Sequence, residues 1–441
     1  MISTLPAVSA LLLSVAILLI GNGMQGTLIG VRAGLEAFSP VALGVVSSAY
    51  YLGFSLGCLS GSWFINRVGH IRTFAVLASI ASAVALIHSL DVTPLSWSLL
   101  RVVTGICLAG LYLVIESWLN DRVDNERRGA LLAIYMVVNF GGAAAGQQLL
   151  RVGDPSGFEL FILSSVLVSL ALVPVALTTS AAPAPVVSGR PDLLMLYRIS
   201  PLGSLSAFGA GMSNAAFWGL APLFGFSVGM NIGEIATFMS VVVLGGVVLQ
   251  WPVGWLSDRF DRRRIITATT ALLTASSLAV YLVSDGASTW LLAGGFVFGG
   301  FSLTLYSLAV AHTNDHTGDI DLVQVSAGLL LMFGAGSVVG PIIAGYVMEA
   351  FGPGRLFLYV AVVSALMTLF ALYRMTCSEP IPLDEQADFV AVTPTAGSAL
   401  DPRGEPLPEE RLSGALPADE ALPGEFLSEE TLHDGASRRD G

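Results

Sequence analysis

The sequence predicts an all-α membrane protein with twelve transmembrane helices in two pseudo-symmetric six-helix halves. Three observations predict it: the composition is strongly apolar, apolar runs recur at the length of a membrane span, and the second half of the chain repeats the first. Of the 441 residues, 54% are hydrophobic and only 12% are charged, with a mean hydropathy of +0.76. An ordinary soluble domain is about 25% charged. The composition therefore excludes a normal globular enzyme.

The lengths of the apolar runs decide the type of element. A helix needs roughly 20 apolar residues to cross a bilayer core about 30 Å thick, whereas a barrel strand is about half as long and alternates. Twelve runs meet the helical length, at 7–30, 40–64, 73–90, 95–118, 129–150, 157–179, 201–226, 233–256, 265–284, 288–311, 325–350 and 353–375. The first run lacks a basic n-region and a cleavage pattern, so we expect a retained span and not a signal peptide.

These spans divide the chain into an N-terminal half (1–179), a cytoplasmic linker (180–200), a C-terminal half (201–375) and a tail (376–441). All 20 basic residues are arginines, and twelve of them fall in the connections on one side of the membrane. The opposite connections hold only three, Arg32, Arg151 and Arg355. By the positive-inside rule we expect both termini in the cytoplasm of a multi-pass protein in a bacterial-type cytoplasmic (inner) membrane.

The tail concentrates the negative charge. Residues 376–441 hold 15 acidic residues, 4 basic residues and eight prolines, a composition that predicts an acidic disordered cytoplasmic segment. We expect the tail to be dispensable for insertion and turnover. A partner-binding helix within 405–433 is the alternative, and such a partner is unknown. The rest of the chain is almost neutral, which argues against a nucleic-acid partner.

An internal repeat relates the two halves at an offset of 192 residues. The segment SWFINRVGHIR (62–72) aligns with GWLSDRFDRRR (254–264), and Asn22 in the first span aligns with Asn214 in the seventh. A charged loop motif and a buried amide that recur at one offset indicate duplicated six-span halves, an architecture known among transporters.

These motifs resemble the major facilitator superfamily over about residues 5–375, and the ESWL run at 116–119 is similar to its YcaD-like branch. GWLSDRFDRRR is similar to the family's loop signature G-x-x-x-D-R-x-G-R-R, with Asp261 in place of the second glycine. The first-half copy has Ser62 for the leading glycine and Asn66 for the aspartate.

Two further elements carry the resemblance. RVVTG, from Arg101 to Gly105, is similar to the family's R-x-x-x-G element, and GSVVGPIIAG (336–345) is similar to its proline-containing glycine motif, although it stands in span eleven instead of span five. The resemblance implies conformational-switch loops that contain Asn66, Arg67, Gly69, Arg72, Asp258, Arg259, Arg262 and Arg263. It also implies a helix-packing motif made of Gly336, Gly340, Pro341 and Gly345, and a role for Arg101 in proton coupling.

Arg101 and Glu116 are the charged residues well inside the predicted spans. They stand fifteen residues apart on span four, which places them about 22 Å apart along one face, too far to touch. Arginine inside a membrane is costly and is functional by default, but a side chain near the outer end can also snorkel to the headgroups. Glu116 needs a partner or a proton. It either carries protons or pairs with Arg67, Arg72 or Arg122.

Amides and aromatics inside the spans suggest a solute cavity. Amides cost free energy in lipid unless they are paired, so they should face inward. They either join helices or line a cavity suited to an organic solute. The candidates, with Arg101 and Glu116, are Asn22, Gln25, Tyr112, Asn139, Gln147, Asn214, Trp218 and Gln250.

We therefore predict a secondary active transporter that moves a small organic solute by alternating access and is coupled to protons. The alternatives are an uncoupled facilitator and a non-transporting membrane receptor or scaffold. A membrane-embedded enzyme would need a nucleophile or metal cluster, and the sequence offers none. We expect no cofactor and no metal, and we assign His312 and His316 to a solvated loop.

Overall fold

The computed structural model describes residues 4–121, 125–177, 192–284, 288–317, 322–377, 379–383 and 385–394. These residues form helices and no strands. The helices of the first half are α1 (Thr4–Leu35), α2 (Pro40–Val68), α3 (His70–Leu90), α4 (Pro94–Asp121), α5 (Asn125–Leu149), α6 (Glu159–Leu170) and α7 (Leu172–Ala176), with a 3-10 turn η1 (Leu150–Val152). The later helices are α8 (Leu193–Ile199), α9 (Pro201–Ser227), α10 (Ile232–Ser257), α11 (Arg262–Leu282), α12 (Thr289–Asn314), α13 (Leu322–Phe351) and α14 (Arg355–Cys377).

Each predicted span coincides with one long helix, except that α6 and α7 together form the sixth, which confirms the all-helical fold class. Among the described residues, ten helices are long and apolar enough to cross a membrane. The two long helices outside that group are α5, which begins with the polar run NERR, and α9, which is rich in glycine and serine. For these two, membrane crossing stays a prediction.

Local sequence signals explain where several helices begin and end. Ser39 caps α2 by accepting a hydrogen bond from the backbone nitrogen of Ala42, and Pro40 follows it at the first helical position. Asn231 and Glu234 form a capping box at the start of α10. Gly69 separates α2 from α3 with φ of +93°, a value that favours glycine.

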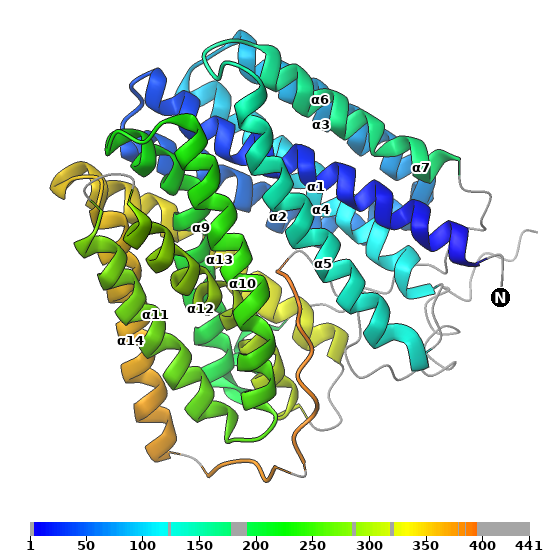
Figure 1. Ribbon diagram of the computed structural model, residues 1–441. Coiled ribbons are helices and arrows are strands. Elements are labelled where there is room, and N and C mark those ends of the chain that lie inside the picture. The colour runs from blue at the N-terminus through cyan, green and yellow to red at the C-terminus, as the bar shows by residue number, and fades with distance from the viewer. Residues whose placement is uncertain are drawn as a thin grey trace, which may run out of the picture. The chain divides into compact units, whose positions relative to one another are not determined.

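The two halves use the same helix pairs (Figure 1). In the first half α1 packs on α5, α2 on α4 and α3 on α6; in the second α9 packs on α13, α10 on α12 and α11 on α14. Gly53 and Gly245, which are 192 residues apart, each bring their helix against the backbone of its partner, where a side chain would overlap a carbonyl oxygen. The predicted pseudo-symmetry is confirmed at this level.

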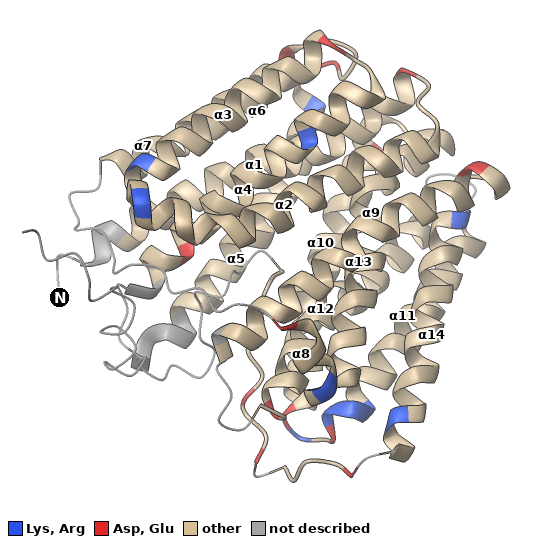
Figure 2. Cartoon of the chain, turned by 180° about the vertical axis from the view of Figure 1, so that it is seen from behind, with Lys and Arg blue, Asp and Glu red and all other residues tan. Residues whose placement is uncertain are grey.

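The halves meet through α2 with α13, α5 with α10, and α1 with α9. We call the end that holds the α2–α3 and α10–α11 loops the arginine-rich end, and the opposite end the distal end. Hydrogen bonds join the halves at the distal end: Arg151 Nη2 donates to Gly233 O (2.8 Å), and Gln148 Nε2 donates to Ser240 Oγ (2.7 Å). Charged residues concentrate near the helix ends (Figure 2).

The predicted linker and tail are described in part. Residues 178–191 of the linker region lie outside the described residues, and α8 follows them, capped by Asp192. Of the predicted tail, 379–383 and 385–394 form an irregular segment that follows α14, and 395–441 lie outside the described residues. The division into half, linker, half and tail remains a prediction.

Candidate functional site

A cavity of about 240 Å³ lies between the two halves. Residues of α1, α2, α4 and α5 line it from the first half, and residues of α9, α10, α12 and α13 line it from the second. Residues 392–394 complete the wall. The cavity therefore lies where relative motion of the halves would change access to it.

Seven of the ten predicted cavity residues line this space. They come from α1, α4, α5 and α9 and are Asn22, Arg101, Tyr112, Asn139, Gln147, Asn214 and Trp218. The amide residues recur because inward-facing positions of these helices are the places where a polar side chain avoids lipid. Contact with a solute remains a prediction for all of them.

Two of the lining amides also join helices. Gln147 accepts a hydrogen bond from Thr27 Oγ1 and donates to the carbonyl oxygen of Gly23 (3.2 Å), which links α5 to α1. Asn214 accepts from Ser302 Oγ (2.7 Å) and donates to the Ser302 carbonyl (3.3 Å), which links α9 to α12. The two roles weighed for these amides, helix contact and cavity lining, thus coincide.

Arg101 is the charged residue among the described residues that line the cavity. Its side chain is 9% exposed, and its guanidinium carbon lies 4.2 Å from the centre of the Tyr50 ring. Nε and Nη1 are buried and have no hydrogen-bond partner in the described structure. A cation–π contact stabilises the charge but satisfies none of these donors.

Three predicted residues do not line the cavity. Glu116 is fully buried on α4 and accepts a hydrogen bond from the Tyr135 hydroxyl (3.1 Å). Gln25 is buried against other helices, and Gln250 donates to Ser307 Oγ (3.1 Å). Each of them follows a lining residue of its own helix by three, four or seven positions, which helix geometry places on the same face. Contacts with neighbouring helices, and not helix periodicity, therefore keep these side chains out of the cavity wall.

Sequence reasoning missed a polar and aromatic wall on α2. Tyr50, Tyr51, Phe54, Ser55 and Cys58 all line the cavity. The adjacent tyrosines in the middle of a predicted span were the available signal, because a buried hydroxyl needs a partner or a cavity.

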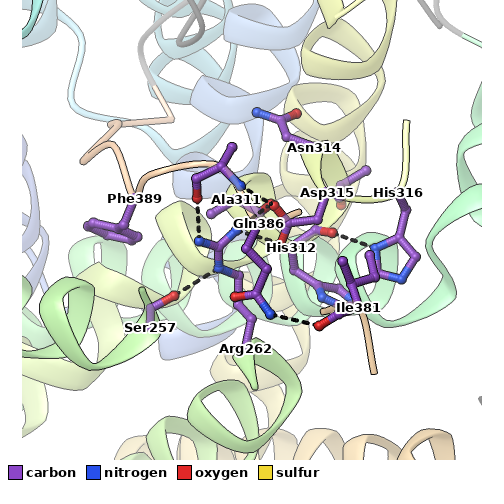
Figure 3. A network of polar contacts seen from close by, with 12 residues as sticks. Ser257, Arg262, Ala311, His312, Asn314, Asp315, His316, Ile381, Gln386 and Phe389 are labelled. Atoms are coloured by element: carbon purple, nitrogen blue, oxygen red, sulfur yellow. Dashed lines mark hydrogen bonds and ion pairs between the residues drawn. The ribbon is translucent and has the colours of Figure 1, made fainter. Parts of the chain in front are cut away.

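The loop motif of the second half forms a compact ion-pair network (Figure 3). Arg262 is 1% exposed; its Nη1 contacts Asp315 Oδ2 (2.5 Å) and its Nη2 contacts Asp258 Oδ1 (3.3 Å). Its Nε donates to Ser257 Oγ (2.9 Å), so the guanidinium ties the start of α11 to the ends of α10 and α12. Burial raises the pKa of the Asp315 carboxyl, and the charge of Arg262 opposes that shift.

The neighbouring predicted residues of this loop have different partners. Arg263 Nη2 contacts Asp261 Oδ2 (2.8 Å), and the Arg259 guanidinium lies 3.8 Å from the Trp255 ring centre. Burial favours a higher pKa for Asp261, but its hydrogen bonds from Arg263 and the nearby arginine charges outweigh burial, so the pKa lies below its ordinary value.

The first-half copy of the loop is more open. Arg72 is exposed, and the Arg67 guanidinium carbon lies 5.5 Å from the Trp63 ring centre. Asn66, at the position equivalent to Asp258, has no charge to offer an arginine. Among the described residues the ion-paired loop network therefore belongs to the second half.

The predicted packing motif lies where α13 crosses α9 and α2. Side chains at Gly336 and Gly340 would overlap the backbone of α9 at Phe208 and Met212. Gly345 approaches the Pro40 carbonyl of α2, where a Cβ would lie 2.6 Å from the oxygen, and the Pro341 carbonyl faces Gly44. The motif thus permits close helix approach within the second half and between the halves.

The comparisons with known proteins agree with this geometry. The model of the Major Facilitator Superfamily matches residues 11–202 and 203–403. The chain belongs to the Major Facilitator Superfamily. Two relatives are MFS-type transporters named YcaD. That of Escherichia fergusonii is 27% identical over 367 residues (83% of this chain, 95% of the relative). That of Salmonella typhi is 29% identical over 338 residues (75% and 86%). The predicted family and branch are confirmed.

Solved structures of other transporters share the fold. The nucleoside transporter NupG superposes with a TM-score of 0.69 at 11% identity, covering 83% of this chain and 98% of NupG. A bacterial homologue of the human lysosomal transporter Spinster, in its inward-facing and unoccupied conformation, gives 0.63 at 16% identity (84% and 95%). The Escherichia coli fucose:proton symporter FucP gives 0.53 at 15% identity (84% and 99%). This family and the membrane helices indicate a multi-pass inner-membrane transporter.

Proposed function

We propose that this superfamily member is a secondary active transporter that moves a small organic solute through the cavity between its halves by alternating access. The observation that carries the proposal is the position of the cavity: both halves line it, and hydrogen bonds between the halves close the distal end. The positive-inside rule assigns the arginine-rich end and both termini to the cytoplasm. We infer that this conformation faces the cytoplasm, with residues 392–394 in the cavity wall.

We further propose that protons drive the transport, with Glu116 as the proton carrier. Glu116 is fully buried on the same helix as Arg101, and its position one turn after Tyr112 places it next to the cavity wall. Tyr135 holds one of its carboxylate oxygens. A carboxyl group in this setting can bind a proton in one conformation and release it in the other, if the conformational change alters the access of water to the carboxyl group. FucP, which has the same fold, is a fucose:proton symporter.

The first experiment identifies a solute and then tests coupling. A thermal-shift screen of metabolites on the purified protein finds compounds that bind the folded state, because such ligands raise the melting temperature. Uptake of each compound into proteoliposomes is then measured with and without an imposed pH gradient. Accumulation of the solute on the gradient supports the proposal. Binding without any uptake would support a receptor, and uptake that ignores the gradient would support an uncoupled facilitator.

The second experiment tests the carrier. Glu116→Gln is nearly isosteric and is expected to fold normally yet to abolish accumulation driven by the pH gradient. Glu159→Gln, on an exposed carboxylate at the start of α6, is the matched control and should behave as wild type. If the Glu116→Gln protein still concentrates solute on the gradient, Glu116 is not the carrier and a structural role for it is preferred.

A further inference from the structure

The charge balance of the cavity points to the chemical class of the solute. Arg101 brings one fixed positive charge, since guanidinium stays protonated in proteins. None of the described residues that line the cavity is Asp or Glu. Nε and Nη1 of Arg101 are buried and have no hydrogen-bond partner in the described structure, which leaves two strong donors unsatisfied. Such a site is incomplete until an anion fills it.

The other residues that line the cavity indicate the chemistry of the remainder of that anion. Tyr50, Tyr51, Phe54 and Trp218 offer aromatic surface, and Asn139 adds a buried amide. The cavity volume of about 240 Å³ lies just below the range of roughly 300–1,000 Å³ that is typical of ligand pockets. This combination fits a small, partly apolar molecule with hydrogen-bonding groups.

We propose that the solute is a small organic monocarboxylate whose carboxylate is bound by Arg101, with its apolar body against the aromatic wall of α2 and α9. One arginine matches one negative charge and can bind a carboxylate through two parallel hydrogen bonds. A doubly charged phosphate ester would need a second cation, and the described lining offers none. The inference rests on the proposed transport function, because it names the transported solute. Binding at this site can nevertheless be tested without transport.

The test compares matched compounds on purified full-length protein. A panel of aromatic and aliphatic monocarboxylates, their primary amides and their phosphate counterparts is screened by thermal shift, and dissociation constants are then measured. We expect carboxylates to raise the melting temperature and the amides to have no effect. Arg101→Gln should weaken carboxylate binding about tenfold or more, because a hydrogen-bonded charge partner is lost. Arg355→Gln, which removes an arginine stacked on Tyr281 away from the cavity, is the control.

Several results would overturn this proposal. They are equal stabilisation by amides and carboxylates, stronger stabilisation by phosphates, no stabilisation by any carboxylate, or full carboxylate affinity in a folded Arg101→Gln protein. Carboxylate binding without uptake would leave this inference standing and would contradict the proposed transport function instead.

A second, independent observation concerns the segment that follows α14. Residues 385–394, here called the strap, run back along α10 and α12 toward the cavity (Figure 1). At the arginine-rich end Arg262 Nη2 donates to Ala387 O (2.7 Å), and Ala387 N donates to Asp315 Oδ1 (3.2 Å). The strap is therefore bound by the same ion-pair network that joins α10, α11 and α12 (Figure 3).

Further contacts hold the strap on its path from the arginine-rich end toward the cavity. Phe389 N donates to Asp258 Oδ1 (2.7 Å), and the Phe389 ring lies against Gly254, where a side chain would collide with it. Deeper in the protein, Ser307 Oγ donates to Val392 O (2.8 Å), and Val392 N lies 3.1 Å from the same hydroxyl. Residues 392–394 then line the cavity.

We infer that the strap is an autoinhibitory element that occupies the route between the arginine-rich end and the cavity and competes with the solute. The position of residues 392–394 in the cavity wall means that a solute entering by this route must displace them. This inference revises our expectation that the whole tail is dispensable, because its first part reaches the site.

Hydrogen exchange on the full-length protein tests whether the strap is bound. The amides of Ala387, Phe389 and Val392 donate hydrogen bonds, so they should exchange at least about tenfold more slowly than in a synthetic peptide of residues 385–394. Phe389→Asp places a carboxylate beside Asp258 and should abolish the protection. Leu383→Asp, at an exposed position before the strap, should leave it intact.

The functional arm uses the same two variants. We expect Phe389→Asp to bind the monocarboxylate that raises the melting temperature of wild type at least about threefold more tightly than wild type does. Leu383→Asp should bind this monocarboxylate with the affinity of wild type. Amides of wild-type protein that exchange as fast as those of the free peptide would overturn the inference. Loss of protection in Phe389→Asp without any gain in affinity would also overturn it, because the strap would then be bound but would not compete.

Discussion

At the scale of single residues, Asp261 shows how a departure from a family motif is compensated. The superfamily signature has glycine at this position, whereas here Asp261 Oδ1 accepts a hydrogen bond from Arg263 N (3.0 Å) and caps α11. The same carboxylate pairs with the Arg263 guanidinium. The substitution therefore exchanges backbone freedom in the loop for a defined start of the next helix.

Asp261→Ala is accordingly expected to destabilise the protein by about 1 kcal/mol through loss of the cap. The folded-state pKa of Asp261 lies below its ordinary value, so its contribution is present above the unfolded-state pKa of about 4 and is lost as the pH falls. Thermal unfolding in detergent should thus show the full difference from wild type at pH 7 and a shrinking difference below pH 4. A constant difference across this range would contradict the assignment.

Asp258 and Asn66 occupy equivalent loop positions but have unequal roles. Asp258 accepts hydrogen bonds from Arg262 and from Phe389 N, and burial raises the pKa of its carboxyl. We predict that Asp258→Asn lowers the maximal transport rate in proteoliposomes more than Asn66→Ala does, because only the former removes a charge paired with an arginine. Equal and negligible effects of the two changes would refute the prediction.

At the scale of helices, glycine decides how closely α13 can approach α9. Gly336 and Gly340 face the α9 backbone at Phe208 and Met212, where any side chain would overlap a carbonyl oxygen. Small residues at such crossings let van der Waals contacts and hydrogen bonds hold membrane helices together, since lipid provides no hydrophobic drive between them. Ser337 adds a hydrogen bond between the two helices, to the Gly211 carbonyl (3.4 Å).

Gly336→Val should therefore force α13 away from α9 and cost about 1–3 kcal/mol, as overpacking does. Gly141→Val on α5 is the matched control, because a Cβ there would meet open space. The melting temperatures of the two purified variants provide the comparison. If the two variants have the same melting temperature, the close approach of α13 to α9 contributes little to stability.

At the scale of the whole molecule, hydrogen bonds between the halves are concentrated at the distal end of the part that the structure describes. Arg151 donates to Thr237 Oγ1 (2.6 Å) as well as to Gly233 O, and Val41 N donates to Glu349 Oε2 (3.2 Å). The strap occupies the opposite route. Closure at one end and a route from the other are what alternating access requires of one of its two conformations.

Arg151→Ala is expected to weaken the distal closure and to shift the population toward the opposite conformation. Spin labels at the exposed residues Ile71 and Phe260 report on the arginine-rich end, and labels at Phe158 and Phe351 report on the distal end. The variant should shorten the first distance and lengthen the second. Arg355→Ala, which leaves the contacts between the halves intact, should change neither. Distances at the two ends that change independently would argue against alternating access.

The sequence by itself determined the helical class, the positions of the long helices and the family, and seven of the ten cavity residues it predicted line the cavity. Span length and polarity are set by the bilayer, so apolar runs and arginines report directly on topology. Asn22, Arg101 and Asn214 could be assigned because a polar group inside a span must face protein or water. These are local consequences of the solvent, and they need no knowledge of neighbouring helices.

Tertiary structure alone decided which inward faces share one cavity. Glu116 and Gln250 satisfy the same sequence criteria as Asn139, yet they hydrogen-bond to Tyr135 of α5 and Ser307 of α12, because packing partners distant in the chain decide which neighbour covers each position. The positions of Tyr50 and Tyr51 in the cavity wall likewise depend on packing between helices. The strap depends on contacts of Ala387, Phe389 and Val392 with Arg262, Asp258 and Ser307 across more than eighty residues of chain. Composition describes the tail as polar and proline-rich, but only the fold brings a matching set of donors and acceptors to its first residues.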